Sequence, residues 1–344
     1  MSALTRRAFT ASVPLALAAF APQARAQPRA RPLVIAHRGA SGERPEHTLM
    51  AYQRAIDQGC DFIEPDLVMT SDDVLVARHE NEISETTDVA GRPEFASRRT
   101  ERSIDGVKVA GWFTEDFTLA ELKTLRARER LPALRPASAA FDGVEPIPTF
   151  QEVMELAKAQ SQLTGRTIGV YPEMKHPTYF KARGMAMGES LAAALRDNDL
   201  DRRDAPVFVQ CFEPKPLRAF RGISAAPTVM LAGAGALSDT LLAELAEFAD
   251  GLGPELKMVL RLDQAGLPPT GLIARAQGAG FKVHPWTVRL ENSFLPAALR
   301  RGEDPAAHGE ADILLRALFA AGADGVFTDF PEAAVKIRDA MFAG

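Results

Sequence analysis

The stretch VIAHRGASGERPEHT, residues 34–48, decides the fold. Apolar and small residues run directly into His37, Arg38 and Gly39, which predicts a buried strand that ends in polar side chains. A loop rich in Gly, Ser, Glu and Pro follows, and Thr48 precedes the helical pattern of residues 49–59. In β/α barrels, functional side chains gather where the strands end. The stretch therefore predicts a strand–helix unit and part of a site at the same time.

The rest of the chain repeats this alternation of short apolar strands and longer amphipathic helices. Its 344 residues are 46% hydrophobic and 25% charged, as in ordinary globular proteins. Repeated strand–helix units indicate a parallel sheet, and eight such units close into a barrel. We assign residues 74–80 to a hairpin partner of the second strand, while residues 251–254 give only a weak strand pattern. The prediction is a TIM (β/α)8 barrel with a small insertion after the second strand; a doubly wound open sheet is the alternative.

A long polar stretch, residues 81–113, lacks periodicity and is predicted to be the insertion. We place the whole of residues 27–344 in one barrel domain.

The two cysteines of this domain, Cys60 and Cys211, lie in apolar settings, so two buried free thiols are favoured over a disulfide. The formal net charge of −5 offers no basic surface for nucleic acid.

The first 26 residues have the anatomy of an export signal. Arg6 and Arg7 precede an apolar, Ala-rich run that is too short to span a membrane, and Ala24-Arg25-Ala26 resembles a cleavage site. The paired arginines favour the twin-arginine route and a periplasmic location. A basic disordered N-terminus is the alternative, but it leaves the apolar run unexplained. Cleavage would change the net charge from −5 to −8, and nothing else in the sequence resembles a membrane anchor.

Polar and ionisable residues mark the ends of most predicted strands. A single one would be unremarkable, but burying so many charged groups without a function would be costly. Glu64 and Asp66 are two residues apart and share one face of their strand, as do Glu173 and Lys175. The complete set is His37, Arg38, Glu64, Asp66, His79, Glu173, Lys175, Gln210, Trp286 and Asp329.

These residue types together indicate phosphoester cleavage. Three converging carboxylates would repel one another unless they held a cation, and hard oxygen ligands select Ca²⁺ or Mg²⁺ over zinc. Arg38 and Lys175 beside that cation would bind an anion such as phosphate. His37 and His79 would supply an acid and a base near neutral pH. No Ser or Cys lies in a nucleophile-elbow motif, so a covalent intermediate with the protein is not expected.

The motifs HRGASGERPEHT, EPDLVMTSDDVLVARHE, YPEMK, VQCF, HPWTV and GVFTDFP resemble those of the glycerophosphodiester phosphodiesterases, in the order expected for that family. The exported, periplasmic branch is the most similar. The resemblance implies a β/α barrel that hydrolyses small-molecule glycerophosphodiesters, such as glycerophosphocholine, to an alcohol and sn-glycerol 3-phosphate. It gives no oligomeric state and no preferred alcohol.

The resemblance also implies a role for each matching residue. His37 and His79 would be the acid/base pair, and Glu64, Asp66 and Glu173 would hold the metal, usually Ca²⁺ in this branch, with Mg²⁺ possible. Arg38 and Lys175 would bind the phosphate, and Glu46 would orient the site. Gln210, Phe212 and Trp286 would form the glycerol end of the pocket. His47 occupies a position where many members have Asn, and no catalytic role is expected for it.

In the implied mechanism, the glycerol 2-hydroxyl attacks the phosphate, and water then opens the cyclic phosphate that results. Which histidine acts first is not decided by the sequence. Two alternatives stay open: a lyase-type phosphodiesterase for phospholipid head groups, and a non-catalytic periplasmic protein that binds organophosphates. Among the other histidines, His176 and His308 are expected to be solvated, whereas His284 could face either the pocket or the surrounding shell.

Overall fold

The computed structural model describes residues 31–343, so the predicted signal peptide, residues 1–26, lies outside the described residues. Strands and helices alternate along the described chain, and eight parallel staves follow one another in sequence order. The staves are β1 (Leu33–His37), β2 with β3 (Phe62–Glu64, Asp66–Met69), β7 with β8 (Gly169–Val170, Glu173–Met174), β9 (Val209–Cys211), β10 (Thr228–Ala232), β11 (Gly251–Pro254), β12 (Lys282–Val283) and β13 (Gly325–Thr328).

Two of these staves are interrupted by proline. Pro65 separates β2 from β3 and Pro172 separates β7 from β8, because a proline has no N–H to give to a neighbouring strand. The first and last strands pair in parallel, with Ile35 opposite Phe327.

The remaining junction, between β12 and β13, is joined by backbone hydrogen bonds that close the sheet. Asp324 N donates to Val283 O at 2.9 Å, and Val288 N donates to Phe327 O at 2.8 Å. The barrel prediction is confirmed, and closure excludes the open doubly wound sheet. The weakly predicted residues 251–254 form a fully buried stave, β11.

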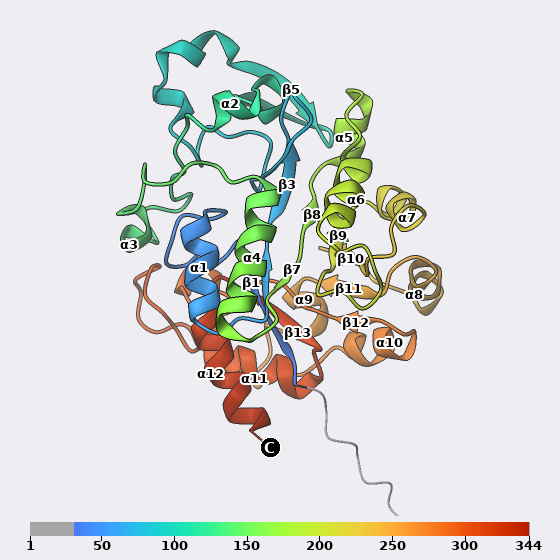
Figure 1. Cartoon of the computed structure of the whole chain (residues 1–344). Helices are drawn as coiled ribbons and strands as arrows, with labels where there is room; N and C mark the ends of the chain where they lie inside the picture. Colours follow the sequence, from blue (N-terminus) through green and yellow to red (C-terminus); the bar gives the residue numbers. More distant parts are fainter. Residues whose placement is uncertain (1–30, 344) are drawn as a thin grey trace, which may run out of the picture. The chain divides into compact units, whose positions relative to one another are not determined.

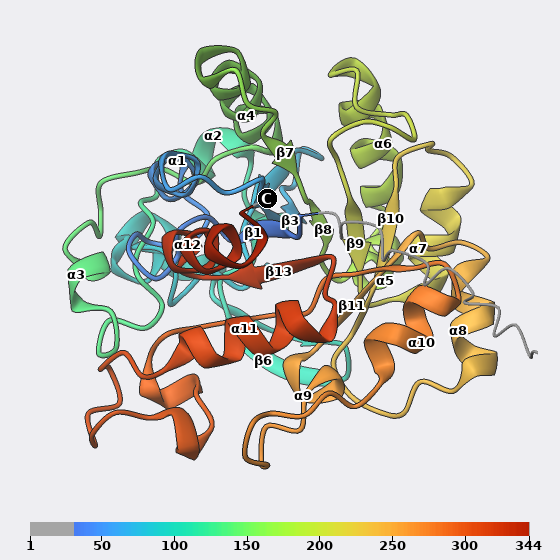
Figure 2. The same ribbon diagram turned by 90° about the horizontal axis from the view of Figure 1, so that it is seen from below.

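Helices surround the strands, as the end-on view in Figure 2 shows. Each follows a stave and turns an apolar face inward; in α6, for example, Met187, Leu191 and Leu195 are buried. Thr149 begins α4 through a capping box with Glu152. The ring is α1 (Leu49–Asp57), α4 (Phe150–Thr164), α6 (Met187–Asp197), α7 (Pro214–Arg221), α8 (Asp239–Ala246), α10 (Leu272–Gly278), α11 (Ala311–Ala321) and α12 (Pro331–Phe342).

The barrel interior is packed with side chains rather than open. Ile35, Phe62, Tyr171, Val229 and Phe327, from different staves, form a small buried cluster inside the sheet. A much larger apolar cluster lies between the strands and the surrounding helices. Cys60 and Cys211 are both buried and free, as expected. No helix within residues 31–343 is long and apolar enough to cross a membrane.

The second stave leads into a hairpin and then into the insertion, coloured teal in Figure 1 above the ends of the strands. β4 (Leu75–Ala77) runs antiparallel to β3, as the hairpin prediction required. Residues 78–149 then leave the barrel before α4 begins. They hold an antiparallel pair, β5 (Thr100–Ile104) and β6 (Val107–Gly111), and two short helices, α2 (Leu119–Leu122) and α3 (Pro136–Ala139).

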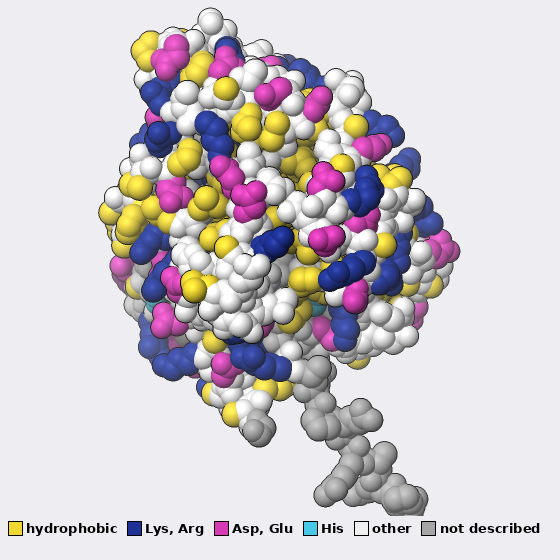
Figure 3. Space-filling view, viewed as in Figure 1, with side chains coloured by type: hydrophobic (Ala, Val, Ile, Leu, Met, Phe, Trp, Pro, Cys, Tyr) yellow, Lys and Arg dark blue, Asp and Glu magenta, His cyan; other side chains and the backbone are white. Residues whose placement is uncertain are grey.

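Several short elements complete the described chain. Two short helices, α5 (Pro177–Ala182) and α9 (Leu256–Val259), are not part of the ring of helices around the barrel. On the surface, Lys and Arg alternate with Asp and Glu across the face seen in Figure 3. Short 3₁₀ segments occur at Val89–Gly91, Pro93–Arg98, Thr114–Asp116, Asn292–Phe294 and Ala297–Leu299.

Candidate active site at the carboxyl end of the barrel

The end of β1 places two cationic or basic groups in the mouth of the barrel. Arg38 has a left-handed backbone, with φ of 60°, and Gly39 follows at φ of 85°. A Cβ on Gly39 would lie 2.6 Å from the backbone carbon of Ala51, so only glycine allows this turn to pass so close to α1. The tight turn keeps His37 and Arg38 at the edge of the sheet instead of carrying them onto the helix.

His37 is oriented by a carboxylate from the last strand. Its Nδ1 lies 2.6 Å from Oδ1 of Asp329, which directly follows β13. A carboxylate only accepts hydrogen bonds, so Nδ1 carries the proton and Nε2 is the nitrogen available to a substrate. Burial, helped by the charge of Arg38, lowers the pKa of His37 to about 3. His37 is therefore a neutral imidazole near pH 7.

Glu64, Asp66 and Glu173 meet in one buried cluster. Each offers an oxygen, and these oxygens lie within 4.8 Å of one another. Burial and the neighbouring carboxylates raise the pKa of Glu64 well above its usual value, and burial raises that of Glu173 to about 8. Although burial acts in the opposite direction, Lys175 holds the pKa of Asp66 well below its usual value.

A divalent cation fits this cluster by the chemistry of its donors. All three residues offer hard carboxylate oxygens, the ligands that Ca²⁺ and Mg²⁺ prefer. Three buried carboxylates repel one another, and a cation between them would offset that repulsion and favour the ionised forms of Glu64 and Glu173. Glu64 and Glu173 also line the neighbouring pocket, so a bound cation would be within reach of a substrate.

Arg38 and Lys175 are fixed cations beside the cluster. The Arg38 guanidinium donates to Oε2 of Glu46 at 3.0 Å and lies 3.3 Å from Asp66. The ammonium group of Lys175 lies 3.0 Å from Glu173. Both side chains are buried, and although burial lowers their pKa values, the surrounding carboxylates raise them. Both side chains therefore stay charged and line the pocket, where they can bind an anion.

His79 enters the same pocket from the hairpin after β4. That hairpin pairs Leu67 with Ala77, so His79 lies one residue past the position opposite Asp66. Its side chain is 27% exposed, and its Nδ1 lies 3.1 Å from Oε1 of Glu80. Burial, followed by the charges of Arg38 and Lys175, lowers the pKa of His79 to about 4.

The pocket between these groups has a volume of about 170 Å³. One wall is apolar: Phe212 and Trp286 meet edge to face with ring centres 5.6 Å apart. Gln210 donates from its amide to Oε1 of Glu64 at 2.9 Å and also lines the pocket. The predicted site residues that line it are His37, Arg38, Glu64, His79, Glu173, Lys175, Gln210, Phe212 and Trp286.

Two predicted residues lie behind this lining. Asp66 and Glu46 both contact Arg38, and Glu46 also accepts a hydrogen bond at 3.0 Å from Arg130 of the insertion. His47 lies deeper still: its Nε2 is 2.9 Å from Asp66 and its Nδ1 is 2.8 Å from the hydroxyl of Tyr52. These contacts fix the orientation of the residues that reach the pocket.

The structure also places in the site residues for which the sequence pattern predicts no role. Asp329 was visible as a polar residue at a strand end, but its contact with His37 was not predicted. Its Oδ2 accepts hydrogen bonds from Arg135 at 2.6 Å and from Arg289 at 2.8 Å. Arg135 comes from the insertion and also donates to Glu291 at 2.6 Å. Arg135 stands in no strand pattern, so no periodicity could have found it. Arg289 directly follows the HPWTV motif, residues 284–288, so its position at a strand end was a signal that could have found it.

The remaining histidines lie outside the pocket. His284 is buried and its Nδ1 lies 2.8 Å from the hydroxyl of Tyr171, so it belongs to the shell rather than the pocket. The expectation that His176 is solvated is wrong, because both of its ring nitrogens contact carboxylates and its side chain is only 15% exposed. His308 is exposed, as expected, and its ring packs edge to face against Phe330.

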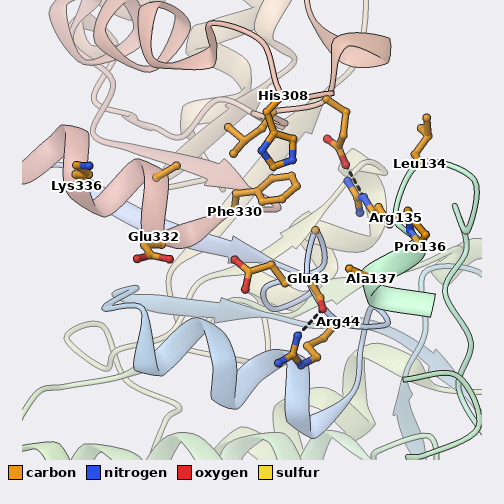
Figure 4. A pocket seen from close by; sticks show the side chains of 14 residues that line it. Glu43, Arg44, Leu134, Arg135, Pro136, Ala137, His308, Phe330, Glu332 and Lys336 are labelled. Carbon is orange, nitrogen blue, oxygen red and sulfur yellow. Dashed lines mark hydrogen bonds and ion pairs between the residues drawn. The ribbon is translucent and has the colours of Figure 1, made fainter. Parts of the chain in front are cut away.

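A larger cavity, of about 640 Å³, lies between the insertion, α12 and the loop after β1, and Figure 4 shows Arg135, His308, Phe330 and Lys336 around it. It contains neither His37 nor His79 and none of the clustered carboxylates. Arg135 lines this cavity and also reaches Asp329, which connects the cavity wall to His37. The acid/base and anion-binding groups are all in the smaller pocket.

Fold and site together define a β/α-barrel protein whose pocket suits an anionic ester. Comparison with known proteins makes this specific: residues 37–333 match the model of the glycerophosphoryl diester phosphodiesterase family, and the chain belongs to that family.

Named relatives agree with this assignment. A glycerophosphodiester phosphodiesterase of Arabidopsis thaliana is 34% identical over 87% of this chain and 84% of its own length. One from Haemophilus influenzae is 27% identical over 91% of both chains.

Solved structures share the fold. A phosphodiesterase from Oleispira antarctica, in complex with the product sn-glycerol-3-phosphate, has a TM-score of 0.62 at 20% identity, covering 90% of this chain and 97% of that one. A glycerophosphodiester phosphodiesterase from Agrobacterium tumefaciens has a TM-score of 0.58 at 18% identity, covering 89% and 99%.

Proposed function

We propose that this protein hydrolyses glycerophosphodiesters to an alcohol and sn-glycerol 3-phosphate. The observation that carries the proposal is one pocket in which two histidines, His37 and His79, share the lining with the fixed charges of Arg38 and Lys175. Family membership and the product bound to the Oleispira relative give the substrate class.

Glu64, Asp66 and Glu173 would hold a divalent cation, which we propose is Ca²⁺, with Mg²⁺ as the alternative. When bound, the cation would offset the negative charge that builds up on the phosphate oxygens. Arg38 and Lys175 bind the phosphate from the protein side, the arginine as a fork and the lysine as a point charge. Gln210 fixes Glu64, while Phe212 and Trp286 form a wall for the glycerol carbons.

His37 and His79 exchange the roles of base and acid over two steps. In the first step, one histidine acts as a neutral base and takes the proton of the glycerol 2-hydroxyl while its oxygen bonds to phosphorus. The other enters the step as an imidazolium and gives its Nε2 proton to the departing alcohol as the bond from phosphorus to that alcohol breaks. In the second step, water opens the cyclic phosphate, and each histidine returns to its starting state. An internal attack needs positioning more than a protein nucleophile. Asp329 keeps Nε2 of His37 available for this proton transfer.

An enzyme-coupled assay for released sn-glycerol 3-phosphate tests the proposal, with glycerophosphocholine as substrate and with or without Ca²⁺. Turnover that requires His37 and His79 is the expected result. Binding without turnover would indicate an organophosphate-binding protein instead. Faster cleavage of an intact phospholipid than of its deacylated form would indicate a lyase-type enzyme for phospholipid head groups.

We also propose that the protein is exported to a periplasm by the twin-arginine route. The support is the sequence of residues 1–26, with its arginine pair, apolar run and Ala-x-Ala site. Replacing Arg6 and Arg7 with lysine should retain the protein in the cytoplasmic fraction of cells that express it. An unchanged distribution between fractions would exclude this route.

A further inference from the structure

Four ionisable side chains link the active-site pocket to the tip of the insertion hairpin. Nδ1 of His79 lies 3.1 Å from Oε1 of Glu80, and the other oxygen of Glu80 lies 2.8 Å from Nε2 of His176. Nδ1 of His176 then lies 2.6 Å from Oδ2 of Asp105. Only His79 lines the pocket, so the other three act on the reaction through it.

The chemistry of these contacts fixes where the protons are. Ionised carboxylates only accept hydrogen bonds, so both ring nitrogens of His176 must donate, and His176 is an imidazolium. Consistent with this, the pKa of His176 is raised: burial lowers it, but Glu80 and Asp105 outweigh that effect. With Oε2 of Glu80 occupied by His176, Oε1 accepts the Nδ1 proton of His79. Nε2 of His79 is then the nitrogen presented to a substrate.

The hairpin holds Asp105 in place from two directions. Asp105 and Gly106 both have positive φ, 49° and 83°, which is the backbone of a tight two-residue turn between β5 and β6. Lower on the same hairpin, Arg102 donates to Asp116 at 2.6 Å and to the hydroxyl of Tyr179 at 3.3 Å. Tyr179 lies in α5, which begins directly after His176.

We propose that Glu80 is a positioning residue for His79, and that the insertion holds Glu80 in place through Asp105 and His176. The barrel supplies the pocket, but the insertion determines which nitrogen of His79 faces it. The inference rests on the proposed function, since it gives His79 an acid/base role. The inference also gives a role to the contact between the insertion hairpin and the start of α5, because that contact helps to orient His79.

Kinetics of two single variants and of their double variant test the inference. Glu80→Gln should lower kcat about 10- to 100-fold with little change in KM, as expected when the partner that orients an imidazole is removed. Asp105→Gly removes the outermost carboxylate at a position whose backbone glycine adopts freely. It should lower kcat about two- to fivefold, because Asp105 is exposed and exposed ion pairs are weak. In the double variant, Asp105→Gly should have no further effect.

A matched control lies on the same hairpin. Glu101→Gln removes a carboxylate that pairs with the exposed Lys108 and reaches no active-site residue, so its kcat should equal that of the wild type. Thermal unfolding of all variants separates loss of fold from loss of positioning. In ¹⁵N NMR of the imidazole nitrogens, wild-type His79 should carry its proton on Nδ1, and Glu80→Gln should shift the population toward Nε2–H.

The outcomes separate this inference from the proposed function. If His79→Ala has wild-type turnover, the acid/base role fails and the inference falls with it. If His79→Ala is inactive but Glu80→Gln and Asp105→Gly keep wild-type kcat and the Nδ1–H tautomer, the hydrolase stands and the positioning role is overturned.

Discussion

Replacing Asp329 with asparagine should separate the catalytic role of this residue from its structural one. The change keeps the size of the side chain but removes its charge. Asp329 is 1% exposed and contacts His37, Arg135 and Arg289. An asparagine can turn its NH₂ group toward His37, which would force the proton of the ring onto Nε2 and leave no base facing the pocket.

The structure sets the expected magnitudes. General acid–base catalysis contributes about 10²- to 10⁴-fold in rate, so kcat should fall by that factor, equivalent to about 3–5 kcal/mol of activation free energy. Breaking a buried ion pair costs about 3–5 kcal/mol of stability. We expect about 3 kcal/mol, because Arg135 keeps Glu291 as a second partner and Arg289 is partly exposed.

The assay is release of sn-glycerol 3-phosphate, coupled to a dehydrogenase and followed at saturating glycerophosphocholine. Urea unfolding of the same preparations gives the free energy of unfolding. Asp324→Asn is a matched control, because Asp324 precedes the same strand at the opposite end of the barrel and contacts Gln277 and Val283. It should lose some stability and keep wild-type kcat.

A folded Asp329→Asn protein with wild-type kcat would refute the assignment of His37 as an oriented base. A variant that loses stability as expected but keeps its turnover would show that the contact between Asp329 and His37 is purely structural.

Three further predictions follow from the site and its surroundings. His37→Ala and His79→Ala should each lower turnover by orders of magnitude without unfolding the barrel, as circular dichroism and the coupled assay would show; normal turnover in either would remove its acid/base role. Exhaustive chelation should abolish activity and Ca²⁺ should restore it, whereas full activity after chelation would contradict a metal site at Glu64, Asp66 and Glu173. Burial lowers the pKa of His284 to about 4. As the pH is lowered from 7 to 5, His284 of the unfolded chain therefore binds a proton that the folded protein excludes. The free energy of unfolding decreases over this interval. Over that interval the wild type should lose about 2 kcal/mol more stability than His284→Gln, measured by urea unfolding; equal losses would exclude a neutral buried His284.

The fold was predictable because its signals are local. Most staves are short apolar runs, and most end in polar residues that a core would not otherwise contain. The hairpin of β5 and β6 was missed because most of its residues are exposed and carry no apolar pattern. The interruption of two staves at Pro65 and Pro172 was missed for another reason: the apolar pattern continues across a proline although the backbone pairing does not.

For the site, the sequence predicts most of the residues that line the pocket, but it does not predict all of the contacts between them and their neighbours. Residues at strand ends were found by position, because all parallel strands of a barrel finish on one side. Arg135 could not be found this way, since it comes from a non-periodic segment and acquires its role only by reaching Asp329, 194 residues away. His176 was misjudged because a histidine beside a loop resembles a solvated one until Glu80 and Asp105 arrive from other segments.

The pairing of β1 with β13 has a consequence for how the enzyme is made. His37 and Asp329 are 292 residues apart, so a ribosome must synthesise the chain as far as residue 329 before these two groups can meet. Until then the first strand has an open edge and its histidine lacks a carboxylate partner. Contacts between such distant segments form late and slowly, since a long loop must close before they contribute any stability. Hydrolytic competence should therefore emerge in one step, when the barrel seam closes, rather than grow gradually with chain length.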